Sequence, residues 1–194
     1  MILKTRTVGE PVLRGRARPL RPEEIALPST RELIASMRET MQDAPGVGLA
    51  APQVGLPLQL AVIEDREDYM KDFSREVLAE RERKPVHFHV IINPVLTLES
   101  EPEIEFFEGC LSLPGFVALV PRARKVKVEC LDEHGQAKVI RASGWYARIL
   151  QHEIDHLSGG LYVDRMHSVS LCTLDNFGRH WKGKTAAEVK KLLG

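Results

Sequence analysis

Hydrophobic positions recur along this chain with two different periods, which predicts both helices and strands. A first helix is expected over residues 30–43, where Ser29 and Glu32 have the spacing of a capping box and Pro45-Gly46 stops the pattern. Four apolar residues recur there at helical spacing: Leu33, Ile34, Met37 and Met41.

A second helix is expected over about 145–158. Ser143 stands where an N-cap residue is preferred, and Gly159-Gly160 follows as a stop signal. Near the end of the chain, Thr185 and Glu188 have capping-box spacing and predict a short C-terminal helix.

The middle of the chain has the pattern of antiparallel strands. Leu58 to Ile63 forms one apolar run, and the later runs are separated by Asn93-Pro94, Pro114-Gly115, Pro121 and a turn over 132–135. The fold class expected is therefore α+β, with antiparallel or mixed strands around a central helix. The later strands are expected at 88–92, 104–107, 116–120, 125–131 and 137–141.

Residues 64–84 interrupt the strand pattern with a dense run of charge. A weak helical pattern passes through Tyr69, Phe73, Val77 and Leu78. We interpret this segment as a charged surface insertion.

Composition narrows the class of protein. A chain of 194 residues with 43% hydrophobic and 28% charged residues fits one globular domain, residues 1–194. Lys plus Arg equals Asp plus Glu, at 27 each, so no overall field favours a specific nucleic-acid sequence or a membrane surface. We find neither a signal-peptide pattern nor a membrane-spanning run, and we expect a soluble mature protein. Three irregularly spaced cysteines suit a reducing compartment rather than a disulfide framework.

The second helix carries the chemistry, in the sequence His152-Glu153-Ile154-Asp155-His156. Two imidazoles one helical turn apart point at the same place, which is typical of metal binding. Glu153 lies one position further round the helix, where it suits the role of general base and then general acid. The same stripe continues back through Ile149 to Trp145 and predicts an apolar pocket beside the metal. Histidines at this spacing can also be ordinary packed or surface residues.

Two histidines leave a catalytic metal site short of one ligand, and a thiolate is the best candidate to complete it. Cys110 lies in Glu108-Gly109-Cys110-Leu111-Ser112, where the glycine permits close backbone approach. A single cysteine in a strand is more often a small core residue, which is how we interpret Cys130 and Cys172.

A glycine-rich segment, Gly46 to Gln53, supplies a further candidate. It follows a helix and has no lysine, so it does not fit a phosphate-binding loop. A tight turn would explain its glycines but not Gln53, whose amide could donate a hydrogen bond to an oxyanion.

Together, these three segments resemble the peptide deformylases, whose motifs are G-x-G-x-A-A-x-Q, E-G-C-x-S and H-E-x-D-H. The resemblance extends from Gly9 to about Met166. It implies a hydrolase that removes the formyl group from N-terminal formylmethionine of newly made polypeptides and releases formate.

The resemblance also implies roles for individual residues. Cys110, His152 and His156 would bind one metal ion, physiologically Fe²⁺ with Zn²⁺, Ni²⁺ or Co²⁺ as substitutes, while Glu153 would handle protons. Gln53 and the backbone N–H of Leu111 would form an oxyanion hole. Asp155 is expected to face the neighbours of the metal-bearing helix, with Arg122 as its nearest basic partner; the alternative is a solvated acid on the helix. Residues expected to contact substrate are Gly46, Val47, Gly48, Glu108, Gly109, Trp145, Arg148 and Ile149.

Two alternatives remain open from the sequence. A zinc endopeptidase also uses H-E-x-x-H, but it normally adds a later His or Glu ligand and needs a long cleft. A purely structural metal domain would need a fourth protein ligand.

The C-terminal end, residues 179–194, is locally basic. A basic helix there could dock on the phosphate-rich ribosome surface, where formylmethionyl nascent chains emerge, or could be a solubilising helix. A bacterial cytoplasm is the expected compartment; an organelle matrix or stroma is the alternative, because the 64–84 insertion resembles longer forms related to organellar enzymes. The basic side chains are Arg179, Lys182, Lys184, Lys190 and Lys191, facing only Asp175 and Glu188 along the sequence.

Overall fold

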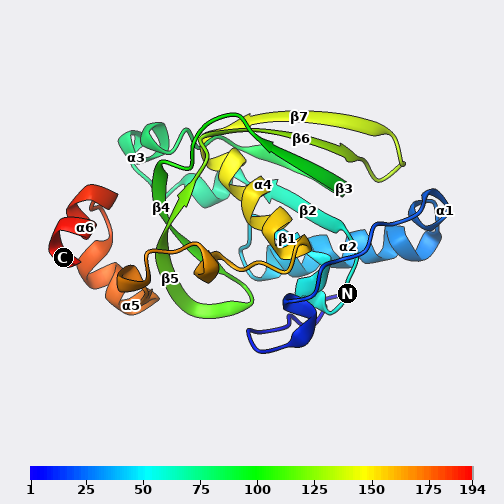
Figure 1. The fold of residues 1–194 in the computed structure, drawn as a ribbon, viewed down its shortest axis with the longest axis horizontal. Helices are drawn as coiled ribbons and strands as arrows, with labels where there is room; N and C mark the ends of the chain where they lie inside the picture. Colours follow the sequence, from blue (N-terminus) through cyan, green and yellow to red (C-terminus); the bar gives the residue numbers. More distant parts are fainter. Residues whose placement is uncertain (194) are drawn as a thin grey trace.

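The computed structural model describes residues 1–193, in which two antiparallel sheets surround one helix, α4 (Gly144–Leu157) (Figure 1). Every strand pair is antiparallel, so the α+β class is confirmed, without mixed strands in either sheet. The three-stranded sheet has the order β4 (Ile104–Cys110), β5 (Leu113–Arg122) and β8 (Cys172–Thr173). The five-stranded sheet has the order β1 (Gly48–Ala50), β2 (Leu60–Asp65), β3 (Val86–Leu98), β6 (Lys125–Leu131) and β7 (Ala137–Ser143).

The remaining elements are helices and single turns around these sheets. The α-helices besides α4 are α1 (Pro22–Ile25), α2 (Pro28–Asp43), α3 (Arg75–Glu80), α5 (Leu174–Asn176) and α6 (Ala186–Leu193). Short 3₁₀ turns cover Pro11–Leu13, Ala51–Val54, Glu67–Met70, Tyr162–Asp164 and Ser168–Ser170, and a π-helical turn covers Phe177–Trp181.

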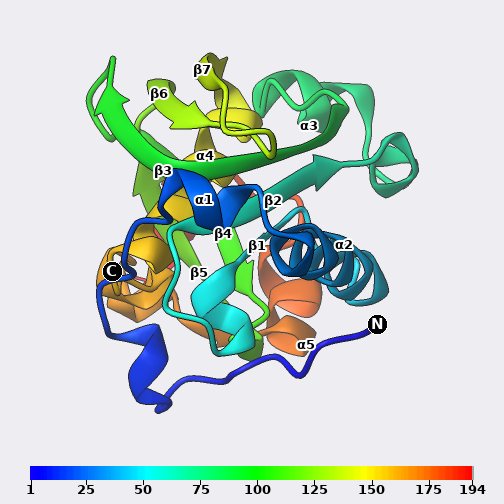
Figure 2. The ribbon, with the colours of Figure 1, turned by 90° about the vertical axis from the view of Figure 1, so that its right-hand side faces the viewer.

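Side chains along β2 point alternately to the two faces of the five-stranded sheet, and a hydrophobic cluster lies on each face. Ala61 and Ile63 join a cluster with the buried face of α4, whereas Leu60 and Val62 join a second cluster with α2. α4 and α2 lie on either side of β2 (Figure 2). Successive strand side chains point to opposite faces, so one strand serves both clusters. α4 is therefore held between the two sheets.

The first helix begins earlier than predicted, and the predicted capping box is wrong. α2 starts at Pro28, with Leu27 at the N-cap and no side-chain cap. Proline suits the first helical position because its fixed φ is helical and it has no N–H to satisfy. The four apolar residues of the predicted stripe face the second cluster, as expected.

The predicted break at Asn93-Pro94 is wrong, because β3 continues through it to Leu98. Asn93 adopts φ 51° and the pairing register shifts there, which marks a bulge. Its side chain accepts from the Leu20 N–H at 2.9 Å and donates to the Leu20 carbonyl at 2.8 Å. A distant segment therefore stabilises an irregularity that the sequence suggested was a turn.

Pro114-Gly115 and Pro121 also fail to interrupt their strand, because β5 runs from Leu113 to Arg122. β8 pairs with β5 only at Phe116 and Val117, so the other edge of β5 is unpaired at Pro121. A residue without an N–H is tolerated at such an edge.

The 64–84 segment is not only a surface insertion, because both of its ends pack into the molecule. Asp65 ends β2 and accepts two hydrogen bonds from Arg83, at 2.8 and 2.9 Å, with both side chains buried. The Arg81 carbonyl accepts from the Trp145 N–H at 2.8 Å, and the Arg81 guanidinium lies 4.9 Å from the Trp145 ring centre. The insertion therefore contacts the start of α4.

The boundaries of α4 agree with the prediction to within a residue. Ser143 is the N-cap residue, although its side chain makes no capping bond. Gly159 takes φ +82° after the last turn, the left-handed conformation that glycine adopts without a Cβ clash.

The C-terminal helix is capped as predicted, and it also contacts β4. Thr185 and Glu188 exchange the two hydrogen bonds of a capping box. Val189 is fully buried, and Lys190 forms an ion pair with Glu105 of β4 at 2.7 Å, so the expectation that Lys190 faces only nearby acids is wrong.

Neither a membrane span nor a disulfide occurs within residues 1–193. No helix there combines the length and apolar character needed to cross a bilayer. Cys130 is a buried core residue, as expected, whereas Cys172 is only half-buried in β8. All three cysteines are free thiols.

Candidate metal centre

The structure brings Cys110, His152 and His156 together between β4 and α4. The Cys110 Sγ lies 3.3 Å from His156 Nε2, and the two histidine Nε2 atoms are 3.2 Å apart. All three candidate ligand atoms lie within 4.8 Å of one another. The one-turn spacing of the histidines and the end of β4 produce this convergence.

These distances fit one metal ion at the centre of the three atoms. Tetrahedral coordination with ordinary metal–sulfur and metal–nitrogen bonds puts ligand atoms about 3.3–3.6 Å apart. Within residues 1–193 this is the group of His, Cys and acidic residues that could hold a metal. A site with three protein ligands is typical of catalysis, since the fourth position stays available.

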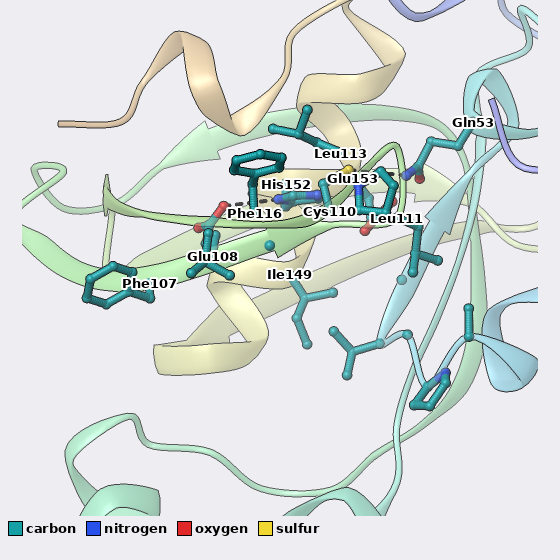
Figure 3. Close-up of a pocket in the computed structure, with 18 of the residues that line it drawn as sticks. Gln53, Phe107, Glu108, Cys110, Leu111, Leu113, Phe116, Ile149, His152 and Glu153 are labelled. Atoms are coloured by element: carbon teal, nitrogen blue, oxygen red, sulfur yellow. Dashed lines mark hydrogen bonds and ion pairs between the residues drawn. The ribbon is translucent and has the colours of Figure 1, made fainter. Parts of the chain in front are cut away.

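Glu108 holds one of the candidate ligands in place. Its Oε2 lies 3.0 Å from His152 Nδ1, on the ring edge opposite the metal position (Figure 3). Arg122 binds the same carboxylate with two hydrogen bonds of 3.0 Å, and Arg148 adds a third at 2.6 Å. Glu108 was predicted to contact substrate, but both of its oxygens are already occupied by the protein.

Asp155 continues this buried network on the other side of Arg122. The predicted Arg122–Asp155 pair is present, and Arg165 adds two hydrogen bonds to Asp155 at 2.7 and 2.8 Å. The sequence did not reveal the role of Arg165, because no motif distinguishes it from other arginines. By contrast, His156 Nδ1 is buried with no hydrogen-bond partner among the described residues.

The charges of the network shift the pKa values of its members. Burial raises the pKa of Glu108, but His152 and Arg122 outweigh it and hold that pKa well below its usual range. Burial lowers the pKa of Arg148 to about 10, despite its contact with Glu108. Burial also lowers the pKa of His156 well below its ordinary value, which favours the neutral imidazole that a metal requires.

Glu153 lies beside the three ligands in a different environment. It is 3% exposed, and its Oε2 has no hydrogen-bond partner among the described residues. Burial raises its pKa to about 7. A Cβ at Gly48 of β1 would lie 2.3 Å from Glu153 Oε1, so any side chain at that position would displace the Glu153 carboxylate. The glycine motif therefore makes room for this carboxylate.

Gln53 faces the same centre from the opposite side. Its Oε1 accepts from the Ala50 N–H at 2.8 Å, which turns its Nε2 toward Cys110 Sγ at 3.5 Å. Ser112, which is fully buried, lies 3.3 Å from the same Nε2 and was not predicted as a site residue. The fixed amide thus presents an N–H donor to the metal position.

A cavity of about 450 Å³ opens beside these groups (Figure 3). All eight residues predicted to contact substrate line it, as does Leu111. Arg148, however, is saturated by Glu108 and by the carbonyls of Val120 and Ile104. Leu113, Phe116 and Leu174 also line the cavity and were missed, because no local motif marks them.

A family model described as polypeptide deformylase matches residues 2–171. The chain belongs to the polypeptide deformylase family. All three motifs and every candidate metal ligand lie within the matched range, whereas residues beyond 171 lie outside it.

Among relatives of the deformylase family, peptide deformylase 1A of Arabidopsis thaliana, chloroplastic/mitochondrial, is 46% identical over 87% of this chain. The chain spans only 62% of that plant protein's length. Peptide deformylase 3 of Streptomyces avermitilis is 43% identical to this chain. The match covers 96% of this chain and 81% of that protein.

A solved deformylase structure has the same fold. The Met-Ala-Ser-bound class I type b peptide deformylase of Acinetobacter baumannii gives a TM-score of 0.76 at 31% identity. The match covers 86% of this chain and 99% of that one.

Proposed function

We propose that this chain is a metal-dependent hydrolase that removes the formyl group from N-terminal formylmethionine of newly made polypeptides and releases formate. The observation that carries the proposal is the arrangement of a candidate three-ligand site, Cys110, His152 and His156, next to the buried carboxylate of Glu153, whose Oε2 has no hydrogen-bond partner within residues 1–193. Family membership supports the choice of reaction.

Each residue around the metal position has a different role in hydrolysis. A divalent cation held by the thiolate and the two imidazoles supplies Lewis acidity, which activates water near neutral pH and polarises a carbonyl oxygen. Glu153 accepts a proton from the attacking water and returns it to the departing amine nitrogen as the C–N bond breaks. Gln53 Nε2 and the Leu111 N–H donate hydrogen bonds to the oxygen that gains negative charge.

The cavity accounts for the proposed substrate. Trp145 and Ile149 line one part of the cavity, which we call its floor. This part is apolar and suits a methionine side chain. β1 and β4 are both edge strands, and residues from both line the cavity, so the peptide backbone can lie between them as an added strand. The Acinetobacter deformylase was solved with Met-Ala-Ser bound, a peptide with the chemistry expected of a product.

We propose Fe²⁺ as the physiological metal, with Zn²⁺, Ni²⁺ or Co²⁺ as substitutes. A mixed sulfur and nitrogen ligand set accepts all four, so the choice follows the resemblance to the family. Metal analysis of protein purified without oxygen, paired with activity after reloading each ion, tests this choice.

Formate release from formyl-Met-Ala-Ser is the direct test of the function. Protein loaded with Fe²⁺ without oxygen should release formate from this peptide and leave acetyl-Met-Ala-Ser intact. Glu153→Gln should retain the metal and lose most turnover, because proton transfer typically contributes about 10²–10⁴-fold. Cleavage of internal peptide bonds without formate release would instead indicate an endopeptidase.

We also propose that the basic end of the chain docks on the ribosome. Lys182, Lys184 and Lys191 are exposed, and no acidic partner within residues 1–193 pairs with them. Changing these three to Gln, with Lys190 kept, should weaken co-sedimentation with ribosomes in a salt-dependent way. Activity on short peptides should not change. Unaltered co-sedimentation at low salt would contradict the proposal.

A bacterial cytoplasm is the proposed compartment. The Streptomyces protein matches over more of its length than the plant protein named for chloroplasts and mitochondria. Fractionation of the source cells, followed by detection of the protein, tests this assignment against an organelle.

A further inference from the structure

The C-terminal segment beyond the family match reaches the substrate cavity. Leu174, the first residue of α5, lines the cavity with a side chain that is 52% exposed. The family match ends at residue 171. A residue outside the three motifs therefore contributes to the wall of the same cavity.

Backbone pairing fixes the position of Leu174 at the mouth of this cavity. Thr173 pairs with Phe116, and Leu174 follows directly, next to the stretch of β5 that lines the cavity. The Thr173 hydroxyl accepts from the Asn176 N–H at 3.3 Å, which starts α5 at Leu174. The side chain is therefore placed by a strand pair and a helix cap rather than by a loose tail.

Two further contacts fasten the segment to β4. The ring of Phe177 lies 4.8 Å from that of Phe107, which also lines the cavity. Farther along, Val189 is fully buried and Lys190 pairs with Glu105 at 2.7 Å. Because the segment is held at both ends, Leu174 can present a fixed surface to a bound peptide.

The mouth of the cavity differs chemically from its floor. The charged residues that line the cavity, Glu108, Arg148 and Glu153, are buried around the metal position. Phe116 and Leu174 are partly exposed apolar residues, at 42% and 52%. A peptide whose methionine occupies the floor can pass this apolar mouth as it leaves the site.

We propose that Leu174 is a specificity-determining residue that selects substrates with an apolar side chain in the residues following the formylated methionine. This inference rests on the proposed deformylase function. Together with Phe116 it covers part of such a side chain from water, whereas a polar or charged side chain gains nothing there. The effect concerns peptide preference and leaves the metal ligands and proton transfer unaltered.

A swap of side-chain chemistry at Leu174 tests the inference. kcat/KM is measured on formyl-Met-Leu-Ser, formyl-Met-Ser-Ser and formyl-Met-Asp-Ser for the wild type, Leu174→Ala and Leu174→Lys. Leu174→Ala should lower kcat/KM for the leucine peptide by about fivefold, less than the tenfold or more for a methylene in a closed pocket, because Leu174 is half exposed. The serine peptide should change by less than about twofold. Leu174→Lys should raise the relative rate on the aspartate peptide through charge attraction.

Leu192→Lys is the matched control, because Leu192 lies in the same C-terminal region, is exposed and does not line the cavity. It should leave the peptide preference unchanged. If the wild type releases formate and neither Leu174 variant alters the ratio between peptides, the inference is overturned while the proposed function stands. If the wild type releases no formate from any peptide, the proposed function fails first.

Discussion

Replacing Glu108 by Gln should both destabilise the fold and weaken metal binding. The change keeps the shape of the side chain but removes its negative charge. That charge is shared by Arg122, Arg148 and His152, through four contacts of 2.6–3.0 Å. Without it, Arg122 retains Asp155 as an acidic partner, whereas Arg148 retains the carbonyls of Val120 and Ile104.

The expected loss of stability follows from the burial of Glu108 and of the two arginines that bind it. The side chains of Glu108, Arg122 and Arg148 are 5%, 3% and 4% exposed, so water does not replace the lost charge. Removing one partner of such a pair typically costs about 3–5 kcal/mol. For a chain of this size that corresponds to a fall in Tm of about 6–20 °C. Loss of the hydrogen bond behind His152 should weaken metal binding by about 10- to 100-fold.

Two measurements separate these effects. Thermal unfolding of metal-free protein, followed by far-UV circular dichroism, reports the fold alone, because bound metal would itself stabilise the native state. Competition with a chelator of known affinity then gives the metal Kd. Glu103→Gln is the control: Glu103 precedes the same strand, is exposed and should change stability by less than about 0.5 kcal/mol.

A second variant tests whether charge imbalance is the cause. Glu108→Gln combined with Arg148→Met removes one charge of each sign and should recover a substantial part of the lost stability. A Tm for Glu108→Gln within about 2 °C of wild type, with an unchanged metal Kd, would refute the reasoning.

Three other predictions follow from the site and its surroundings. Gly48→Ala should keep the metal but lower kcat by about 10²-fold or more, because the new methyl group displaces the Glu153 carboxylate. Cys110→Ala should abolish stoichiometric metal binding, measured by elemental analysis, since two imidazoles alone hold the ion poorly. Burial raises the pKa of Glu64, but hydrogen bonds from Arg38 and Gln42 bring it below its ordinary value. Ionised Glu64 therefore stabilises the fold fully at pH values above its pKa in the unfolded chain, about 4.3, and this stabilisation is lost as the pH falls. Glu64→Gln should lower the free energy of unfolding by up to about 1 kcal/mol at pH 7 and by less in acid.

Controls for these variants come from the same chain. Gly178→Ala adds a methyl group with no atom within 4 Å and should leave kcat unchanged. Cys130→Ala removes a buried thiol outside the candidate metal site and should keep the metal, while Glu32→Gln at an exposed position of α2 should change stability by less than about 0.5 kcal/mol. Wild-type kcat in Gly48→Ala, full metal content in Cys110→Ala, or a pH-independent difference for Glu64→Gln would contradict the corresponding argument.

The sequence by itself determined the features that depend on local spacing. The one-turn separation of His152 and His156 places both imidazoles on one face of α4, wherever that helix packs. The strand over 125–131 and the Thr185–Glu188 cap were also predicted correctly, because alternation and capping act within a few residues. The three ordered motifs likewise indicated the family before any geometry was known.

Tertiary structure decided the features that depend on contacts between distant segments. Leu20 stabilises the bulge at Asn93 from 73 positions away, which turns an apparent break into continuous strand. Arg122 and Arg148 hold the Glu108 carboxylate, so that it supports the candidate metal ligand His152 rather than facing substrate.

The same reason explains the residues that the sequence did not reveal. Arg81 reaches the start of α4, and Leu174 reaches the cavity, only because the chain folds back on itself. Neither lies in a motif or a periodic run, since the free energy that places them comes from packing against partners far along the sequence. Local patterns therefore predicted the candidate metal ligands and much of the cavity lining, whereas the assembled fold decided which of these side chains already have partners within the protein.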